Sequence, residues 1–225
     1  MSFSSYRRIT DLPGDVPVFP LRGVILLPRA TLPLNIFEPR YLAMLDDVIS
    51  GNRILGVIQP FATDHDNESP KEDDIQLKKV GCVGRVTGFQ ELDDGRLAIS
   101  LTGIARFRAI NEKTDSKPYR TLSVSYDEFS DDLISGHGED EVNREDLLEV
   151  LKTYLEAHNL QADWQAIEAA STELLVNALS TISPFGPEEK QALLEAQTLQ
   201  KRAEVLTTLA TMDLAADYRS GGSVQ

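Results

Sequence analysis

The sequence predicts an α+β protein whose first part is built from strands and whose second part is built from helices. In the first part, Asp94-Gly95 separates two segments rich in apolar residues, which is a strong short-range signal for a β-hairpin. In the second part, leucines recur at the spacing of one helix face. These patterns divide the chain into a flexible arm at 1–14, a β domain at 15–128, a linker at 129–142, a helical subdomain at 143–218 and a flexible tail at 219–225.

The first strand of the β domain is expected at Val16–Leu21, a short apolar run. Its two prolines cannot donate to a β ladder, so the strand begins or ends at them or lies at a sheet edge. Pro28 and Pro33 then exclude a helix, because each removes a backbone donor and clashes with the preceding turn. The chain is therefore predicted to stay extended as far as Phe37.

A helix is predicted to begin at Pro39 and to end near Ser50. Proline suits the first helical position, where its missing N–H has no partner, and Glu38 places a carboxylate at the positive end of the helix dipole. The apolar residues that recur on one face are Tyr41, Leu42, Leu45, Val48 and Ile49. The following run, Ile54–Ile58, is apolar throughout and too short for a helix, which predicts a central strand covered on both sides.

The residues at 61–76 are polar, as is typical of a mobile surface loop. His65 lies here among three carboxylates, but their spacing matches neither a calcium loop nor a zinc site, so we predict no metal ligands. Cys82 is the one cysteine, which excludes an intrachain disulfide, and its apolar setting indicates a buried strand position.

The hairpin is predicted to join strands at Val80–Leu92 and Arg96–Gly103. A two-residue turn would place Leu92 opposite Leu97, Gln90 opposite Ile99 and Gly88 opposite Leu101. Glycines opposite large residues indicate close packing or curvature, as at the corner of a barrel. Two further strands are expected at Ile104–Ile110 and Tyr119–Tyr126, and the strand arginines Arg85, Arg106 and Arg108 are expected to be solvated or paired.

Four amphipathic helices are predicted in the second part, enough to bury one another as a bundle. The first carries Leu147, Leu148, Leu151 and Leu155 and ends near His158-Asn159. The second begins with Asp163 as N-cap, runs through Leu179, and ends at the Ser183–Gly186 segment. A shorter helix begins at Pro187, and the last runs from about Leu199 to Asp217.

Composition narrows the class of protein and the class of partner. With 41% hydrophobic and 26% charged residues, a chain of 225 residues is ordinary for a folded protein. It shows no signal-peptide pattern and no run of about 18 apolar residues, so we expect a cytoplasmic protein that does not enter a membrane. Residues 1–128 hold 18 acidic and 16 basic side chains, so the net charge of −14 arises mostly from the second part. Without a basic stripe, we expect no nucleic-acid partner.

The chain contains no recognisable catalytic arrangement. Its three histidines lie in unrelated segments, no serine has the context of a nucleophile, and no GxxxxGK[ST] loop is present. The carboxylate pairs at 46–47, 73–74 and 93–94 fall in solvated helix, loop and turn positions that structure alone explains. We therefore predict no catalytic residues and no cofactor.

Four motifs occur in an order and at a spacing that match a known family: PVFPLRGVILLP, LPLNIFEPRYLAML, ILGVI and GCVGRVTGFQELDDGRLAISLTGIARFRA. Over about residues 16–126 they closely resemble the N-terminal substrate-binding domain of bacterial Lon proteases and the related Lon-like domain of cereblon. The later segment SPFGPEEKQALLEAQTLQKRAEVL resembles the C-terminal helices of the same region. The resemblance implies a PUA-like β pseudo-barrel followed by a C-terminal helical bundle.

The resemblance also implies a function in protein binding. The chain ends at Gln225 without the ATPase and Ser-Lys protease domains of a complete Lon protease, so we expect a stand-alone module that is not an enzyme. It would bind unfolded or apolar polypeptide segments, as an adaptor for a protease in bacterial protein quality control. The candidate contact residues, for an apolar patch near the first helix or for strand addition at a sheet edge, are Phe19, Phe37, Arg40, Tyr41 and Phe61.

Each of these candidates also has a structural explanation. The four aromatic residues are equally suited to the core, and Arg40 to a pairing with Glu38. Two other functions remain open, an RNA-binding PUA-like module and a hydrolase related by homology to the ATP-dependent protease. The acidic net charge argues against RNA. The sequence leaves the client and the oligomeric state open.

Overall fold

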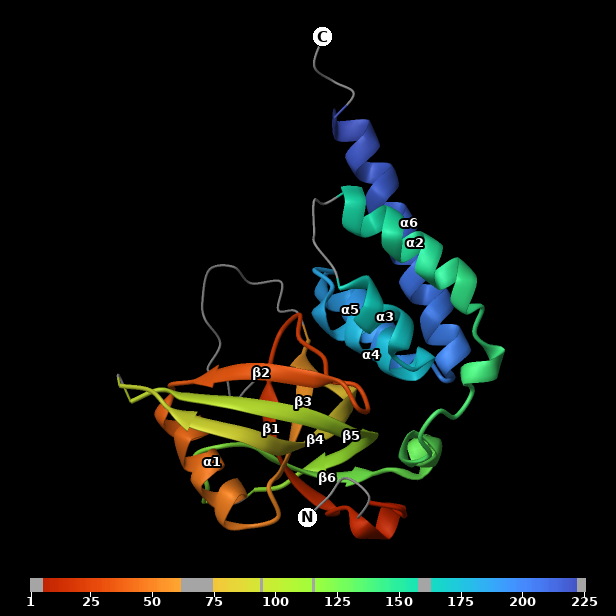
Figure 1. The fold of residues 1–225 in the computed structure, drawn as a ribbon. Coiled ribbons are helices and arrows are strands. Elements are labelled where there is room, and N and C mark those ends of the chain that lie inside the picture. The colour runs from red at the N-terminus through yellow and green to blue at the C-terminus, as the bar shows by residue number, and fades with distance from the viewer. Residues whose placement is uncertain (1–5, 62–74, 94, 115, 158–162, 222–225) are drawn as a thin grey trace. The chain divides into compact units, whose positions relative to one another are not determined.

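The computed structural model describes residues 6–61, 75–93, 95–114, 116–157 and 163–221 (Figure 1). The chain divides into two compact units, Met1–Ile134 and Ser135–Gln225. We call them the β unit and the helical unit and describe each by itself.

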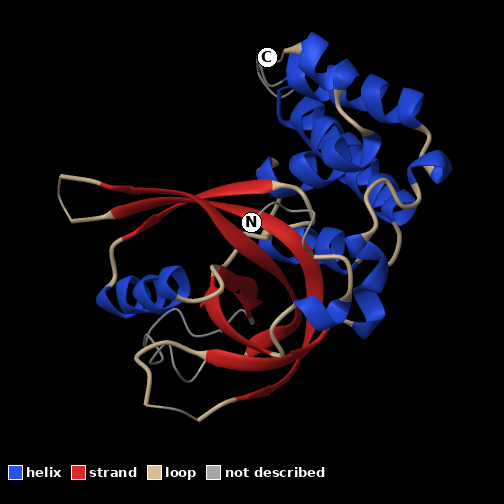
Figure 2. Cartoon of the chain, turned by 60° about the horizontal axis from the view of Figure 1, so that its bottom comes forward, coloured by secondary structure: helices blue, strands red, loops and turns tan. Residues whose placement is uncertain are grey.

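The β unit is built on one six-stranded sheet that curves into a barrel (Figure 2). Its strands are β1 (Asp15–Pro20), β2 (Thr31–Ile36), β3 (Ile54–Pro60), β4 (Leu77–Glu91), β5 (Leu97–Glu112) and β6 (Thr121–Ser125). The strand order is β2-β5-β4-β3-β1-β6, and an additional pairing of β5 with β6 closes the barrel. Only β1 and β3 run parallel among these pairs; the others are antiparallel.

The length of β5 makes the closure possible. Along one edge, its first residues pair with β2, from Leu97 opposite Ile36 to Thr102 opposite Thr31. Its last residues pair with β6, and β4 follows it on the other edge. The sequence predicted two strands separated at Gly103, but the structure has one continuous strand, in which Gly103 pairs with Gly84 and the register shifts between Gly103 and Ala105.

The core of the β unit lies inside this barrel. Its largest fully buried side chain is Phe107, against which Gly81 packs so closely that a Cβ there would come within 2.5 Å of the ring. Leu12 is also buried, after a 3-10 helix η2 at Ile9–Asp11. The Arg85 guanidinium donates a hydrogen bond to the Tyr6 hydroxyl (2.8 Å). From Tyr6 onward the N-terminal segment therefore packs on the barrel, whereas the sequence predicted a flexible arm.

Helix α1 (Pro39–Ser50) forms as predicted, with Pro39 in its first turn and Glu38 at the N-cap. Its apolar face is buried through Tyr41, Met44, Leu45 and Val48. At its end, the Gly51 N–H donates to the Asp47 carbonyl (3.0 Å). The helix lies beside the barrel in Figure 2.

The β4–β5 hairpin forms, but its turn is longer than the two residues predicted. The Leu92 N–H donates to the Arg96 carbonyl (2.9 Å), which leaves three residues in the loop, and Gly95 has a φ of 79°. This three-residue loop pairs Glu91 with Leu97 and shifts the predicted register by one residue. Gly88 consequently lies opposite Ser100.

The segment after β6 contains two short 3-10 helices, η4 (Asp127–Leu133) and η5 (Glu139–Glu141). Within η4, Phe129 and Asp132 are buried. Because the β unit extends to Ile134, η4 belongs to it and not to the linker expected from residue 129.

The helical unit contains α2 (Arg144–Ala157), α3 (Trp164–Ala169), α4 (Thr172–Ile182), α5 (Pro187–Glu195) and α6 (Leu199–Gly221). The second predicted helix is two helices. Asp163 caps α3 as expected, accepting from the Ala166 N–H (3.1 Å). Ser171 then caps α4 by accepting from the Leu174 N–H (3.2 Å), which allows a second helix start. The unit buries leucines from several helices, among them Leu147, Leu151, Leu175, Leu193, Leu194 and Leu206.

Candidate functional site

Two of the five candidate contact residues belong to the core of the β unit. Phe19 is 7% exposed and Tyr41 is 3% exposed, and their ring centroids lie 4.2 Å apart. Phe19 comes from β1 and Tyr41 from the first turn of α1, so the pair attaches the helix to the barrel. The structural explanation of these two residues holds, and neither presents a contact surface.

Arg40 has a structural partner as well. Its guanidinium donates to Glu38 through Nη2 (2.8 Å) and Nε (3.2 Å). The same group lies 4.6 Å from the centroid of the Tyr41 ring. Arg40 therefore braces the start of α1, although part of its side chain still reaches the surface.

Phe37 and Phe61 are exposed. Phe37 follows β2 and is 64% exposed, whereas Phe61 follows β3 and is 42% exposed. The Phe61 N–H donates to the Gln76 carbonyl (2.8 Å), and Lys78 Nζ lies 4.6 Å from its ring centroid. Of the five candidates, these two aromatic side chains are the ones available to an apolar partner.

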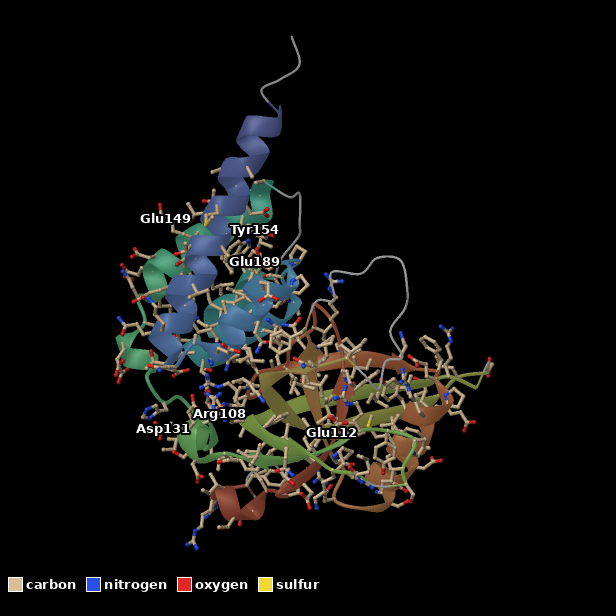
Figure 3. The ribbon with its side chains drawn as sticks, turned by 180° about the vertical axis from the view of Figure 1, so that it is seen from behind. Arg108, Glu112, Asp131, Glu149, Tyr154 and Glu189 are labelled. Carbon is tan, nitrogen blue, oxygen red and sulfur yellow. The ribbon has the colours of Figure 1, made fainter. Side chains whose placement is uncertain are left out.

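Phe61 is one of the residues that line a groove of about 450 Å³. We call it the Phe61 groove; its lining is Phe61, Ile75, Gln76, Leu77, Lys78, Lys79, Ala109, Ile110, Asn111, Glu112, Arg120 and Leu122. Glu112, at the end of β5, is labelled in Figure 3. The groove forms where β4 and β5 separate, since their last pair in this direction is Val80 with Arg108.

The charges in the Phe61 groove are mainly positive. Arg120 donates to Glu112 (2.6 Å from Nε) and to the Ile75 carbonyl (2.7 Å from Nη1). This ion pair offsets one cation with one anion, and Lys78 and Lys79 are the remaining charged side chains of the lining. The groove is thus locally basic in a chain whose net charge is −14.

Sequence reasoning found Phe61 but missed the rest of its groove. Ile110 is 59% exposed, although it follows the buried run that ends at Phe107. It is the extra residue of an irregularity between β5 and β6, where Ala109 pairs with Val124 and Asn111 with Ser123. The available signal was a large apolar residue in the segment Arg108–Glu112, which otherwise holds two charged residues, an alanine and an asparagine.

A second group of polar residues joins α1 to the segment before β6. Tyr119 and Lys117 both donate to the Asp47 carboxylate, and Lys117 Nζ also donates to the Tyr119 hydroxyl (2.8 Å). The hydrogen bond from Tyr119, together with Lys117, lowers the pKa of Asp47. Burial raises the pKa of Tyr119. These contacts hold the segment before β6 against α1, which is a structural role.

The helical unit buries two cationic side chains, those of Lys190 and Arg202. Lys190 Nζ donates to the carbonyls of Ser180 (3.1 Å) and Thr181 (2.5 Å), and burial lowers its pKa to about 8. Arg202 donates to the Leu193 carbonyl (2.9 Å) and to Asn177 Oδ1 (2.9 Å). Both side chains donate hydrogen bonds inside the unit, to backbone carbonyls near helix ends and, for Arg202, also to a side-chain amide oxygen.

The described ranges contain no cluster of three or more His, Cys, Asp or Glu side chains suited to a metal ion. His65 lies outside the described residues. Cys82 is fully buried in β4, as predicted. In the same ranges, no helix has the length and apolar character needed to cross a membrane.

A family model covers most of the chain. The family described as the ATP-dependent protease La (LON) substrate-binding domain matches residues 15–211. The match spans both units, from β1 into α6.

Curated relatives are much longer proteins. A Lon protease of Flavobacterium johnsoniae is 28% identical over 211 residues, which cover 91% of this chain and 24% of that protein. A Lon protease of Dictyoglomus thermophilum is 25% identical over 216 residues, covering 91% of this chain and 25% of the relative. The chain therefore spans about a quarter of the length of these relatives.

Two solved structures have the same fold. The Lon N-terminal domain protein of Xanthomonas campestris aligns with a TM-score of 0.60 at 24% identity, covering 86% of this chain and 97% of that one. The N-terminal domain of a Mycobacterium avium complex Lon protease aligns with a TM-score of 0.64 at 15% identity, covering 88% and 98%. The predicted α+β fold with a helical C-terminal region is confirmed.

Proposed function

Because the chain belongs to the LON substrate-binding domain family, we propose that it binds unfolded or apolar polypeptide segments and acts as an adaptor in proteolysis. The family match over residues 15–211 is the observation that carries this proposal. The curated relatives are proteases, and substrate binding is the part of their action that this family describes. An adaptor would hold a segment by binding alone and release it to a protease.

The exposed aromatic residues support a binding surface on the β unit. Phe37 and Phe61 offer apolar area to a partner, and an apolar segment would gain from covering it. Arg40 lies close in sequence to Phe37 and is the polar member of this proposed surface. Phe19 and Tyr41 would contribute indirectly by fixing α1.

The proposal includes a preference for polypeptide over nucleic acid. A net charge of −14 repels phosphate, and the basic groups of the β unit are balanced by a similar number of acidic ones. It also assigns to this chain binding without catalysis, in agreement with a family match confined to a substrate-binding domain.

The test compares three ligands on the same protein. Binding of a reduced, carboxymethylated protein, of its native form and of a single-stranded RNA would be measured by anisotropy at two salt concentrations. We expect binding of the unfolded form alone, with little change with salt. Salt-sensitive RNA binding without affinity for the unfolded protein would contradict the proposal, as would cleavage of a peptide with or without ATP.

Variants locate the surface. Replacing Phe37 or Phe61 by alanine is expected to weaken binding of the unfolded protein. The free energy of unfolding should change by less than about 0.5 kcal/mol for Phe37, which is 64% exposed, and by about 1 kcal/mol for the half-buried Phe61. Ile182→Ala is the control, since Ile182 is an exposed apolar residue of the helical unit (69%). If all three variants lose the same amount of affinity for the unfolded protein, Phe37 and Phe61 do not form the binding surface.

A further inference from the structure

The structure points to a more specific ligand for the Phe61 groove. We infer that this groove binds an extended polypeptide segment in which apolar side chains alternate with acidic ones, through strand addition to the exposed edge of β5. The inference rests on the proposed function and deepens it, because it names the chemistry of the bound segment and the place where it binds.

At the groove, part of the β5 backbone is open to pairing with an added strand. Beyond the pair of Val80 with Arg108, β4 and β5 diverge. β5 continues for four residues, of which Ala109, Asn111 and Glu112 pair with β6 along its other edge. In the described chain, Ala109–Asn111 therefore have no strand partner on the side that faces the groove. An edge of this kind can donate and accept backbone hydrogen bonds with a peptide in extended conformation.

The groove also offers apolar contacts at intervals. Phe61 and Ile110 are 42% and 59% exposed, and the lining also includes the buried Leu122. Ile75 and Leu77 line the groove from the β4 side. Because successive side chains of an extended peptide point to opposite sides, apolar residues at every second position would face this lining together.

The charge of the groove favours acidic residues at the peptide positions between the apolar ones. Lys78 and Lys79 are consecutive residues of β4 and point to opposite sides of the strand, so one of them lies on the side to which the alternate residues of the peptide point. Arg120 is ion-paired with Glu112. An acidic peptide would be attracted here, and a basic one would be repelled. The chain as a whole carries a net charge of −14, so attraction of an anionic segment depends on local cations such as these two lysines.

The experiment uses the intact protein and short fluorescent peptides. One peptide alternates Val with Glu, a second alternates Val with Lys, and a third is the Val-Glu peptide methylated on alternate backbone nitrogens. We expect binding of the Val-Glu peptide to be at least about tenfold tighter than that of the Val-Lys peptide at low salt, with a smaller ratio at high salt. Backbone methylation is expected to remove the binding, because it removes donors needed for strand pairing.

Two exposed residues of the groove provide the variants. Lys79→Glu and Ile110→Asp are each expected to weaken binding of the Val-Glu peptide by about tenfold. Lys152→Glu is the control for charge, since Lys152 is exposed on α2, and Phe89→Asp is the control for apolar area, since Phe89 is 56% exposed on β4 outside the groove. Both controls are expected to retain wild-type affinity.

The outcomes separate this inference from the proposed function. If the protein binds the carboxymethylated protein but Lys79→Glu and Ile110→Asp bind peptide and unfolded protein as the wild type does, the groove assignment is wrong and the general function stands. Equal affinity for the Val-Glu and Val-Lys peptides overturns the charge selection, and full binding of the methylated peptide overturns strand addition. Absence of any binding to unfolded protein removes the proposed function itself.

Discussion

Among single residues, Arg106 and Asp132 make the most extensively hydrogen-bonded buried ion pair of the described β unit. Asp132 accepts from the Arg106 backbone N–H (2.9 Å) and from its guanidinium (2.8 Å at Nη2), and both side chains are less than 10% exposed. The guanidinium also lies 4.6 Å from the Phe129 ring centroid. The pair therefore fastens η4 to β5.

Removing one partner of this pair is expected to be costly. Asp132→Ala leaves a buried guanidinium without its carboxylate, and we expect the free energy of unfolding to fall by about 3 to 5 kcal/mol. Urea denaturation followed by circular dichroism measures the loss. Glu128→Ala is the matched control, because the Arg108–Glu128 pair is more than 40% exposed and should cost only about 0 to 1 kcal/mol. Similar losses in the two variants would contradict the role of burial.

Lys190 makes the stability of the helical unit depend on pH. Burial lowers its pKa to about 8 in the folded state, against an ordinary value of 10.5 in the unfolded chain. Below pH 8 both states are protonated, and the cost of burying the ammonium group is present in full. Between the two values the unfolded state binds more protons, so the free energy of unfolding rises with pH until about 10.5.

Lys190→Met tests this dependence. We expect the wild type to gain roughly 2 kcal/mol relative to Lys190→Met between pH 8 and pH 10.5, because only the wild type loses the buried charge. Paired denaturant titrations across this pH range measure the difference, and groups common to both proteins cancel in it. A constant difference between the two proteins across the range would show that Lys190 does not titrate there.

At the scale of elements, β5 depends on Gly103. Its N–H donates to the Ala30 carbonyl (2.9 Å) and its carbonyl accepts from the Arg29 N–H (2.9 Å), so the segment before β2 passes directly beside the strand. A Cβ on Gly103 would lie 2.0 Å from the Leu27 carbonyl oxygen. Backbone atoms at this distance cannot be relieved by a side-chain rotation.

Gly103→Ala is therefore expected to destabilise the β unit by about 3 kcal/mol or more. Thermal or urea unfolding of the purified variant measures this loss. Gly14→Ala serves as control, since a Cβ there would meet nothing within 4 Å, and its change should stay within about 0.5 kcal/mol. A Gly103→Ala variant as stable as the wild type would mean that the segment at 27–30 can move away from β5.

The boundaries of elements show where local patterns were sufficient. The sequence predicted the start of α1 at Pro39 and of α5 at Pro187, because proline acts on its own backbone and needs no distant partner. It missed the division of the second helix at Ser171, where a helical hydrophobic pattern continues across the break. Serine is a favoured N-cap residue, so Ser171 was a possible helix start. The apolar residues continue at helical spacing across it, and the prediction followed that spacing.

At the scale of the whole molecule, the two units each have a core. The β unit closes its barrel around Phe107, and the helical unit buries leucines from α2, α4, α5 and α6. We expect fragments Met1–Ile134 and Ser135–Gln225 to fold separately and to unfold cooperatively. Near-UV circular dichroism and amide NMR dispersion of each fragment check this expectation. A fragment with exposed apolar surface and no dispersion would show that its core requires the rest of the chain.

The sequence by itself determined the α+β class, the family resemblance, the order of most elements and the presence of the β4–β5 hairpin. These properties follow from periodicity and from residues with special backbone preferences, which act over a few neighbours. Only the tertiary structure decided that Phe19 and Tyr41 are buried, that Phe37 and Phe61 are exposed, and that a groove opens beside Phe61. Burial, register and strand separation depend on which distant segments meet, and β5 meets β2, β4 and β6 along one strand.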